Sequence, residues 1–540
     1  MQSVGRASAS TVLSAVSERL RASVRIDART LALFRIVVAL LILADLRLRA
    51  RNFGTFYTDD GLVPISMARE AAPIDVVSIY TLSGDPTVTA GLFVLHGLIA
   101  LQLLVGYRTR LATALSFAFV VSLDLRNPLV LSYADVLFAW LLLWAIFVPL
   151  GERWSIDAVH ADRPPRESVA SLGTALILLQ MVTMYVVNGV HKSTSDLWRS
   201  GEAAPLVLGL DELTFLLGDT ARSVPTLLQY GGVAWFVMLL FAWLLVLVRG
   251  RVRTALVCAF ASVHLSFAVT VRIGAFAYVA LAGVLLFLQT DFWDDLATLR
   301  RRLERRSIQP GAPVDRLPAV GCGFGSVRRR LIALAEGVPR ATLGLETPGW
   351  LPRDPSRTVL TAGVLVFAAL AAVSLLSAGG LVASDAGGVQ EAEAATAAFV
   401  SHQTEWSIFA PNPRTTDRYY VFPAKTADGT LLDRYNDREL SYERPTDELQ
   451  TQYGTYRERF YMTSVANGDP PAAPKRLAES LCAAGSADGD ELTHVNMYRV
   501  EEEVTLETID SPSERDRSAV VLFRHGCGDH EPTEFDPPEF

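Results

Sequence analysis

The stretch YVVNGVHKSTSDLWRSGEA, residues 185–203, ends a long apolar segment and places a lysine at its edge. The chain has three lysines among 49 basic residues, so the other 46 are arginines. Lys192 is the one lysine in the apolar part of the chain. A buried lysine can release its proton and an arginine cannot, so this pattern predicts proton chemistry at Lys192. The alternative is a lysine that snorkels to lipid headgroups.

Apolar runs of membrane-spanning length recur along the chain. The protein has 540 residues, of which 50% are hydrophobic, and a mean hydropathy of +0.28. This composition is too apolar for an ordinary soluble enzyme. We predict an α-helical polytopic membrane protein with about nine transmembrane helices. The predicted spans are 30–48, 87–105, 109–125, 133–150, 170–190, 229–248, 254–271, 275–290 and 358–380.

Arginine placement predicts the orientation of these helices. With the N-terminus inside, the loops that carry Arg108, Arg153 and Arg249 fall on the cytoplasmic side, as does the Arg-rich segment 294–357. Lys192 then lies at the outer face of the cell membrane. The expected parts are a cytoplasmic tail (1–28) without signal-peptide features, a membrane domain (29–293), a cytoplasmic linker (294–357), a final helix (358–380) and an extracytoplasmic domain (381–540).

The last part of the chain is strongly acidic. From Gly388 onward it holds 29 acidic and 14 basic residues, a net charge of −15, whereas the remainder carries +7. An acidic, lysine-poor domain is typical of haloarchaeal proteins. We predict strands at 418–423, 456–464, 495–508 and 518–524, and a helix at 474–485, which together indicate a small β-rich α+β domain.

Two cysteines, Cys482 and Cys527, fall in this exported domain. Outside the cell a disulfide between them would persist. The alternative is a pair of free thiols.

Polar side chains inside a membrane are costly, so each is a candidate functional residue. On this topology several lie in the outer half, where facing helices would bring them together into one pocket. The catalytic candidates are Lys192, His191 and His264, and the pocket candidates are Asp45, Asp135, Asn188 and Trp198. The alternatives are a packing role for His264 and helix-capping or interhelical roles for the two aspartates.

Several common motifs are absent from the sequence. It has no P-loop, Gly-rich dinucleotide motif, HExxH or CxxC pair, so we predict no metal site. The arginine runs flank membrane segments, which favours contact with the lipid bilayer over binding of nucleic acid.

Six stretches resemble a known membrane family, and one of them is YVVNGVHKSTSDLWRSGEA (185–203). LALFRIVVALLILADLRLR (31–49), followed by FYTDDGLVP (56–64), resembles the opening of the HTTM domain, the membrane domain related to vitamin K-dependent gamma-carboxylase. Residues 122–157 and 263–287 resemble its central block and later helix pair. EWSIFAPNP (405–413) is similar to the W-x-x-F-x-P stretch that follows the last helix in many relatives.

The resemblance implies a carbon–carbon lyase that uses a reduced lipid quinone, of the menaquinone or vitamin K type, and a secreted or membrane protein substrate. By position, Lys192 matches the family's base and His264 a family histidine. The chain departs from the carboxylase in having His191 before Lys192, where the carboxylase has a second lysine. Its C-terminal domain is also small. Two other functions stay open, namely a non-catalytic module that presents the C-terminal domain, and a transporter.

Overall fold

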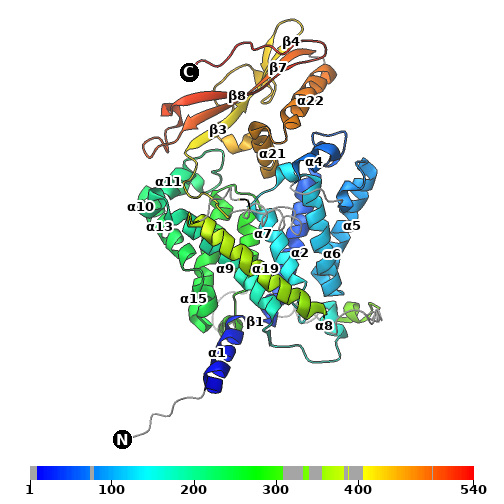
Figure 1. Ribbon diagram of the computed structural model, residues 1–540, viewed down its shortest axis with the longest axis vertical. Helices are drawn as coiled ribbons and strands as arrows, with labels where there is room; N and C mark the ends of the chain where they lie inside the picture. Colours follow the sequence, from blue (N-terminus) through cyan, green and yellow to red (C-terminus); the bar gives the residue numbers. More distant parts are fainter. Residues whose placement is uncertain are drawn as a thin grey trace.

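The computed structural model describes residues 9–72, 78–307, 332–339, 355–381, 387, 406–488 and 491–540. A helical body carries a β-sheet domain at one end (Figure 1). The helices of the body are α1 (Ala9–Ser23), α2 (Ala28–Ala50), α3 (Phe53–Tyr57), α4 (Ile65–Ala71), α5 (Pro86–Val105), α6 (Thr109–Arg126), α7 (Tyr133–Ala145), α8 (Ile156–His160), α9 (Leu172–Ser193), α10 (Asp196–Ser200), α11 (Ala203–Leu208), α12 (Gly218–Arg222), α13 (Pro225–Leu240), α14 (Leu244–Leu247), α15 (Gly250–Thr270), α16 (Phe276–Leu285), α17 (Thr290–Ser307) and α19 (Pro355–Ala378). Short 3-10 turns η1 (Ile79–Thr81) and η2 (Pro128–Val130) and the strand pair β1 (Ile26–Asp27) and β2 (Ser168–Val169) complete the body.

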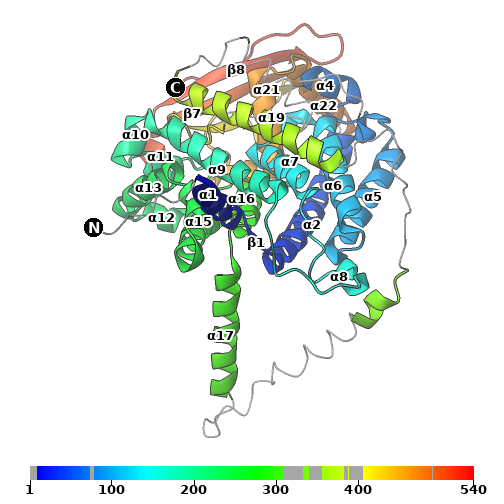
Figure 2. The same cartoon turned by 60° about the horizontal axis from the view of Figure 1, so that its bottom comes forward.

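Each of the nine predicted spans overlaps a helix of the body, yet nine membrane crossings are not confirmed. Within the described residues, α5, α9 and α15 are long and apolar enough to cross a membrane. A fourth crossing results if α16 and α17, which meet at a 93° bend, are counted together (Figure 2). The apolar parts of α7, α13 and α19 are shorter. Helix α2 has five charged residues among its 23, which explains why it is not counted among the helices apolar enough to cross a membrane.

The C-terminal sheet is antiparallel throughout. Its strands are β3 (Thr416–Val421), β4 (Pro423–Thr426), β5 (Leu431–Asp433), β6 (Arg438–Glu439), β7 (Leu492–Glu503) and β8 (Arg517–Gly526). The order is β3-β7-β4-β5-β6, with β8 also paired to β7, so β7 is the central strand. The turns η3 (Leu449–Gln452) and η4 (Pro512–Glu514) and two helices, α21 (Tyr456–Asn467) and α22 (Ala472–Asp488), complete the domain.

The predicted strands at 418–423, 495–508 and 518–524 and the helix at 474–485 match β3 with β4, β7, β8 and α22. The predicted strand at 456–464 is wrong, because these residues form α21. Thr455 caps the start of this helix by accepting a hydrogen bond from the Glu458 amide, and Gly468 ends it with a φ of 65°. The helix lies between the sheet and the body (Figure 1), and its Ser464 donates to the Leu129 carbonyl at 3.1 Å.

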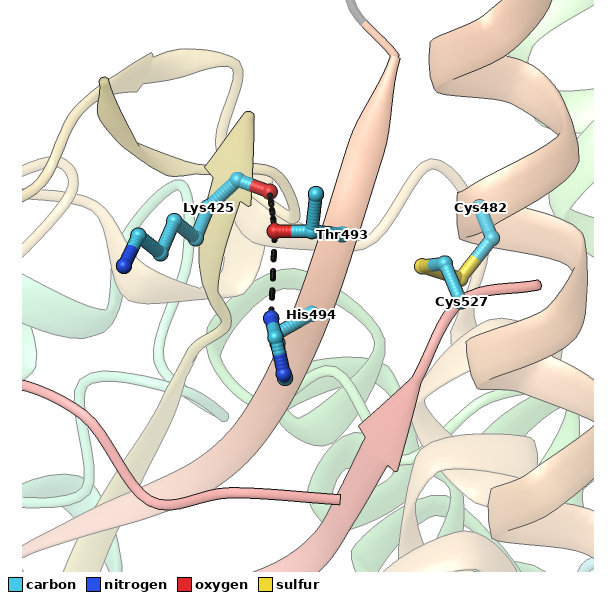
Figure 3. Close-up of a disulfide and its surroundings, with 5 residues drawn as sticks. All are labelled: Lys425, Cys482, Thr493, His494 and Cys527. Carbon is cyan, nitrogen blue, oxygen red and sulfur yellow. Dashed lines mark hydrogen bonds between the residues drawn. A yellow bond between two sulfur atoms is a disulfide. The ribbon is translucent and has the colours of Figure 1, made fainter. Parts of the chain in front are cut away.

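A disulfide joins Cys482 of α22 to Cys527, which directly follows β8 (Figure 3). Of the two alternatives that the sequence allowed, a disulfide or two free thiols, the structure contains the disulfide. It closes a separation of 45 residues and holds α22 against the sheet.

Replacing both cysteines by serine is expected to lower the free energy of unfolding by about 2–4 kcal/mol, because the cross-link restricts the unfolded chain. Thermal unfolding of the full-length protein in detergent, with and without reductant, measures this effect. Cys258→Ser is the matched control, since Cys258 is a free thiol on α15. An unchanged unfolding midpoint in the double variant would contradict the prediction.

Candidate functional site

A cavity of about 340 Å³ lies among α9, α13 and α15, beside the short helices α10 and α11. Its lining is mostly apolar and includes the aromatic rings of Trp235 and Phe267. The polar lining comes largely from α9, through Tyr185, Asn188 and Lys192. Their spacing of three and then four residues places them on one face of this helix.

Lys192 lies in the last turn of α9 and is only 1% exposed. Its Nζ donates to the carbonyl oxygens of Ile408 at 2.5 Å and Phe409 at 3.2 Å. The ammonium position is 4.0 Å from the centroid of the Trp198 ring. Within the described residues we find no carboxylate paired with this amine. Lys192 therefore does not fit the snorkelling alternative, in which the charged end reaches the surface.

The segment Trp406–Phe409 closes the cavity over Lys192. Asn188 Nδ2 donates to the carbonyls of Trp406 at 2.7 Å and Ile408 at 3.1 Å. Trp198 Nε1 donates to the Phe409 carbonyl at 2.9 Å. Trp406 and Phe409 adopt left-handed φ values of 56° and 52°, which cost aromatic residues about 1–3 kcal/mol each. The side chains of α9 and α10 thus hold this segment in a conformation that it would not otherwise adopt.

A tyrosine–histidine pair lies beside the lysine. Tyr185 lines the cavity, and its hydroxyl is 2.7 Å from His264 Nε2 on α15. His264 is 1% exposed, and its Nδ1 has no hydrogen-bond partner among the described residues. His264 therefore contacts the cavity through Tyr185 rather than directly.

The structure does not bring all of the candidate residues together. Asn188, Lys192 and Trp198 line one cavity, whereas Asp45 and Asp135 line another, of about 420 Å³. The expected single pocket is thus divided in two. His191 is half-buried and is not part of either lining, because neighbouring helical residues point about 100° apart.

The two aspartates belong to a buried ion cluster. Arg49 bonds Asp45 at 2.7 Å, Asp124 at 2.6 Å and Asp135 at 3.2 Å. Arg457, from α21, pairs with Asp135 at 2.9 Å and also with Asp45. The cluster therefore joins α2, α6 and α7 of the body to the C-terminal domain.

A second ion cluster joins the same two parts of the molecule. Asp211, after α11, pairs with Arg222 at 2.7 Å and with Arg444 and Arg515 at 3.0 Å. Burial of Asp211 opposes its ionisation, but Arg222, Arg515 and Arg444 outweigh burial and hold its pKa below the ordinary value.

A carboxyl group whose pKa is lowered by folding stabilises the folded state above the unfolded pKa, about pH 4, and loses that contribution as the pH falls further. The thermal midpoint of the wild type is therefore expected to fall steeply below about pH 4. The Asp211→Asn variant is expected to be less stable at neutral pH, and its thermal midpoint should fall less than that of the wild type as the pH drops below about 4. Asp437→Asn, at a carboxylate that is 90% exposed, should reproduce the wild-type profile. Parallel profiles for wild type and Asp211→Asn would contradict the assignment.

Sequence reasoning missed three parts of the site. Tyr185 could have been found from its spacing to Lys192 on one helical face. The carbonyls of Trp406–Phe409 belong to the W-x-x-F-x-P stretch. That stretch indicated a resemblance to the family, but it did not predict a contact with Lys192. Arg457 carried no signal once its segment had been predicted as a strand.

The fold and the cavity define a class of protein: a helical membrane protein with a buried lysine site and a docked C-terminal sheet domain. The chain belongs to the HTTM domain family, whose model matches residues 24–293, half of the 540-residue chain. This family membership agrees with the resemblance found in the sequence. No curated protein and no solved structure matches the chain.

Proposed function

We propose that this protein is an enzyme of the gamma-carboxylase-related type, in which Lys192 takes a proton from a reduced lipid quinone at the outer face of the membrane. The observation that carries the proposal is the placement of the chain's single membrane-domain lysine, buried and without a carboxylate partner among the described residues, in the wall of an apolar cavity.

The residues present fit a lipid quinone. The cavity volume of about 340 Å³ lies in the range of small-molecule sites, and such sites combine apolar walls with a few convergent polar groups. Leu227 of α13 lines the cavity and is 67% exposed. Tyr230, three residues later on the same face of α13, is also exposed. A ligand with a hydrocarbon tail can therefore enter from the bilayer, and Trp235 and Phe267 offer flat surfaces to a ring.

When bound, a quinol supplies an acidic hydroxyl group and two electrons for reaction with oxygen. Lys192 Nζ accepts the hydroxyl proton, so an O–H bond breaks and an N–H bond forms. The ammonium then donates to the Ile408 and Phe409 carbonyls and faces the Trp198 ring, which stabilises the new charge. Asn188 keeps the Ile408 carbonyl in position. The apolar walls exclude water from the amine.

Tyr185 is a second polar residue in the cavity lining. Its hydroxyl contacts His264 Nε2. When His264 is protonated at Nε2 it donates to the phenolic oxygen, and the single hydroxyl hydrogen of Tyr185 is then free to be donated to a quinone oxygen. Tyr185 and His264 thus complete the set of chain groups that can hold or move a proton there.

The test is quinone turnover by the purified protein in lipid. Wild type and Lys192→Ala are given reduced menaquinone, oxygen and bicarbonate, and epoxide is measured by mass spectrometry. Lys425→Ala is the matched control, because Lys425 is an exposed residue of β4. Epoxide from wild type and Lys425→Ala alone supports the proposal. No epoxide from folded wild type, or equal amounts from all three proteins, counts against it.

A second candidate function is a non-catalytic module that anchors and presents the C-terminal domain. The observation that favours it is the docking of that domain through two buried ion clusters, around Arg457 and Asp211. This function needs no base, so it predicts that Lys192 variants which fold are indistinguishable from wild type.

A further inference from the structure

Helix α17 begins attached to the body and then leaves it (Figure 2). In its first turns, Trp293 Nε1 donates to Thr30 Oγ1 at 2.8 Å. Two residues later, Asp295 pairs with Arg251 of α15 at 2.9 Å. These contacts fix the start and the direction of the helix.

The residues that follow are amphipathic and exposed. Leu296, Leu299 and Leu303 are 45%, 53% and 56% exposed. Their spacing of three and four residues places them on one face. The adjoining residues Arg300–Arg302 are also exposed, so a row of leucines is flanked by positive charge. A helix of this kind is typical of the membrane–water interface.

The direction of α17 agrees with that location. The bend between α16 and α17 is 93°, and α16 packs inside the helical body against α2, α7, α9 and α15. If α16 runs across the bilayer, α17 runs along its surface. The arginines complement anionic headgroups, and the helix directly follows α16, which packs among the apolar helices of the body.

We propose that α17 beyond Asp295 is an in-plane helix that binds an anionic phospholipid surface, with Leu296, Leu299 and Leu303 inserted at the boundary between headgroups and acyl chains. The partner is the bilayer rather than another protein, because the apolar face and its flanking charges extend from the membrane part of the chain. This inference does not depend on the proposed enzyme activity.

The experiment places a fluorescent reporter on the full-length protein in single-copy nanodiscs. An environment-sensitive probe is attached at Leu299→Cys or at Ala297→Cys, with Cys258 and Cys322 replaced by serine. Ala297 is the matched control, since a residue two positions earlier lies on the other side of the helix. The discs contain phosphatidylcholine with or without phosphatidylglycerol, and spin-labelled lipids act as quenchers.

The expected result is about threefold stronger lipid quenching at Leu299 than at Ala297 in discs with phosphatidylglycerol. Replacing Arg300–Arg302 by glutamine should remove the dependence on phosphatidylglycerol, and because these residues are exposed, it should leave the fold intact. Equal quenching at the two positions would overturn the proposal. A blue-shifted Leu299 probe that lipid quenchers do not reach would also overturn it, because that result indicates protein contact.

Discussion

Lys192→Arg is expected to abolish quinol turnover as completely as Lys192→Ala, with a loss of about 10²–10⁴-fold, the usual contribution of a general base. Arginine keeps the positive charge but cannot give up its proton at any working pH. Its planar guanidinium also cannot occupy the place of a compact amine between two carbonyls and the Trp198 ring. Initial rates of epoxide formation in lipid measure the effect.

The control for this substitution is Lys425→Arg, which makes the same change at an exposed lysine and should keep the wild-type rate. Lys192→Met separates chemistry from folding, since it preserves the length of the side chain. The segment Trp406–Phe409 would still be held by Asn188 and Trp198, so the Lys192→Met variant should keep its thermal midpoint while losing turnover. Wild-type turnover in Lys192→Arg would exclude the lysine from proton transfer.

Much of this site could be predicted from composition. Because arginine supplies nearly all the positive charge, a lysine at the end of an apolar run stands out, and Lys192 does lie buried in a cavity wall. The apolar runs also predicted the positions of the body helices. These are local properties, which a sequence records directly.

The remaining features depend on contacts between distant segments. The groups that hold Lys192 are backbone carbonyls 216 and 217 residues away, and every residue type provides a carbonyl. Asp45 and Asp135 were singled out as polar residues in apolar surroundings, and the structure places both in the Arg49 ion cluster. Their partner Arg457 lies in a segment whose aromatic and polar residues also fit a strand, so the sequence did not reveal the ion cluster. Only the fold shows that the two aspartates line a different cavity from Lys192.

Arg457→Met is expected to destabilise the protein by about 3–5 kcal/mol, the usual cost of removing one partner from a buried ion cluster. The Arg457 side chain is 3% exposed, and its loss leaves Arg49 alone with Asp45, Asp124 and Asp135. Three carboxylates, of which Asp124 and Asp135 are buried, then share one cation. Helix α21 also loses its main polar link to α2 and α7. The thermal midpoint in detergent, together with limited proteolysis of the C-terminal domain, measures the loss.

Two further variants decide whether unpaired charge is the cause. Arg251→Met breaks an ion pair whose side chains are 80% and 50% exposed, so it should cost no more than about 1 kcal/mol. Adding Asp135→Asn to Arg457→Met removes one of the uncompensated carboxylates and is expected to restore part of the stability. The contrary result is that Asp135→Asn destabilises the Arg457→Met variant by as much as it destabilises the wild type. The two residues would then be acting independently. The cluster would then not be the electrostatic link that holds the sheet domain above the lysine cavity.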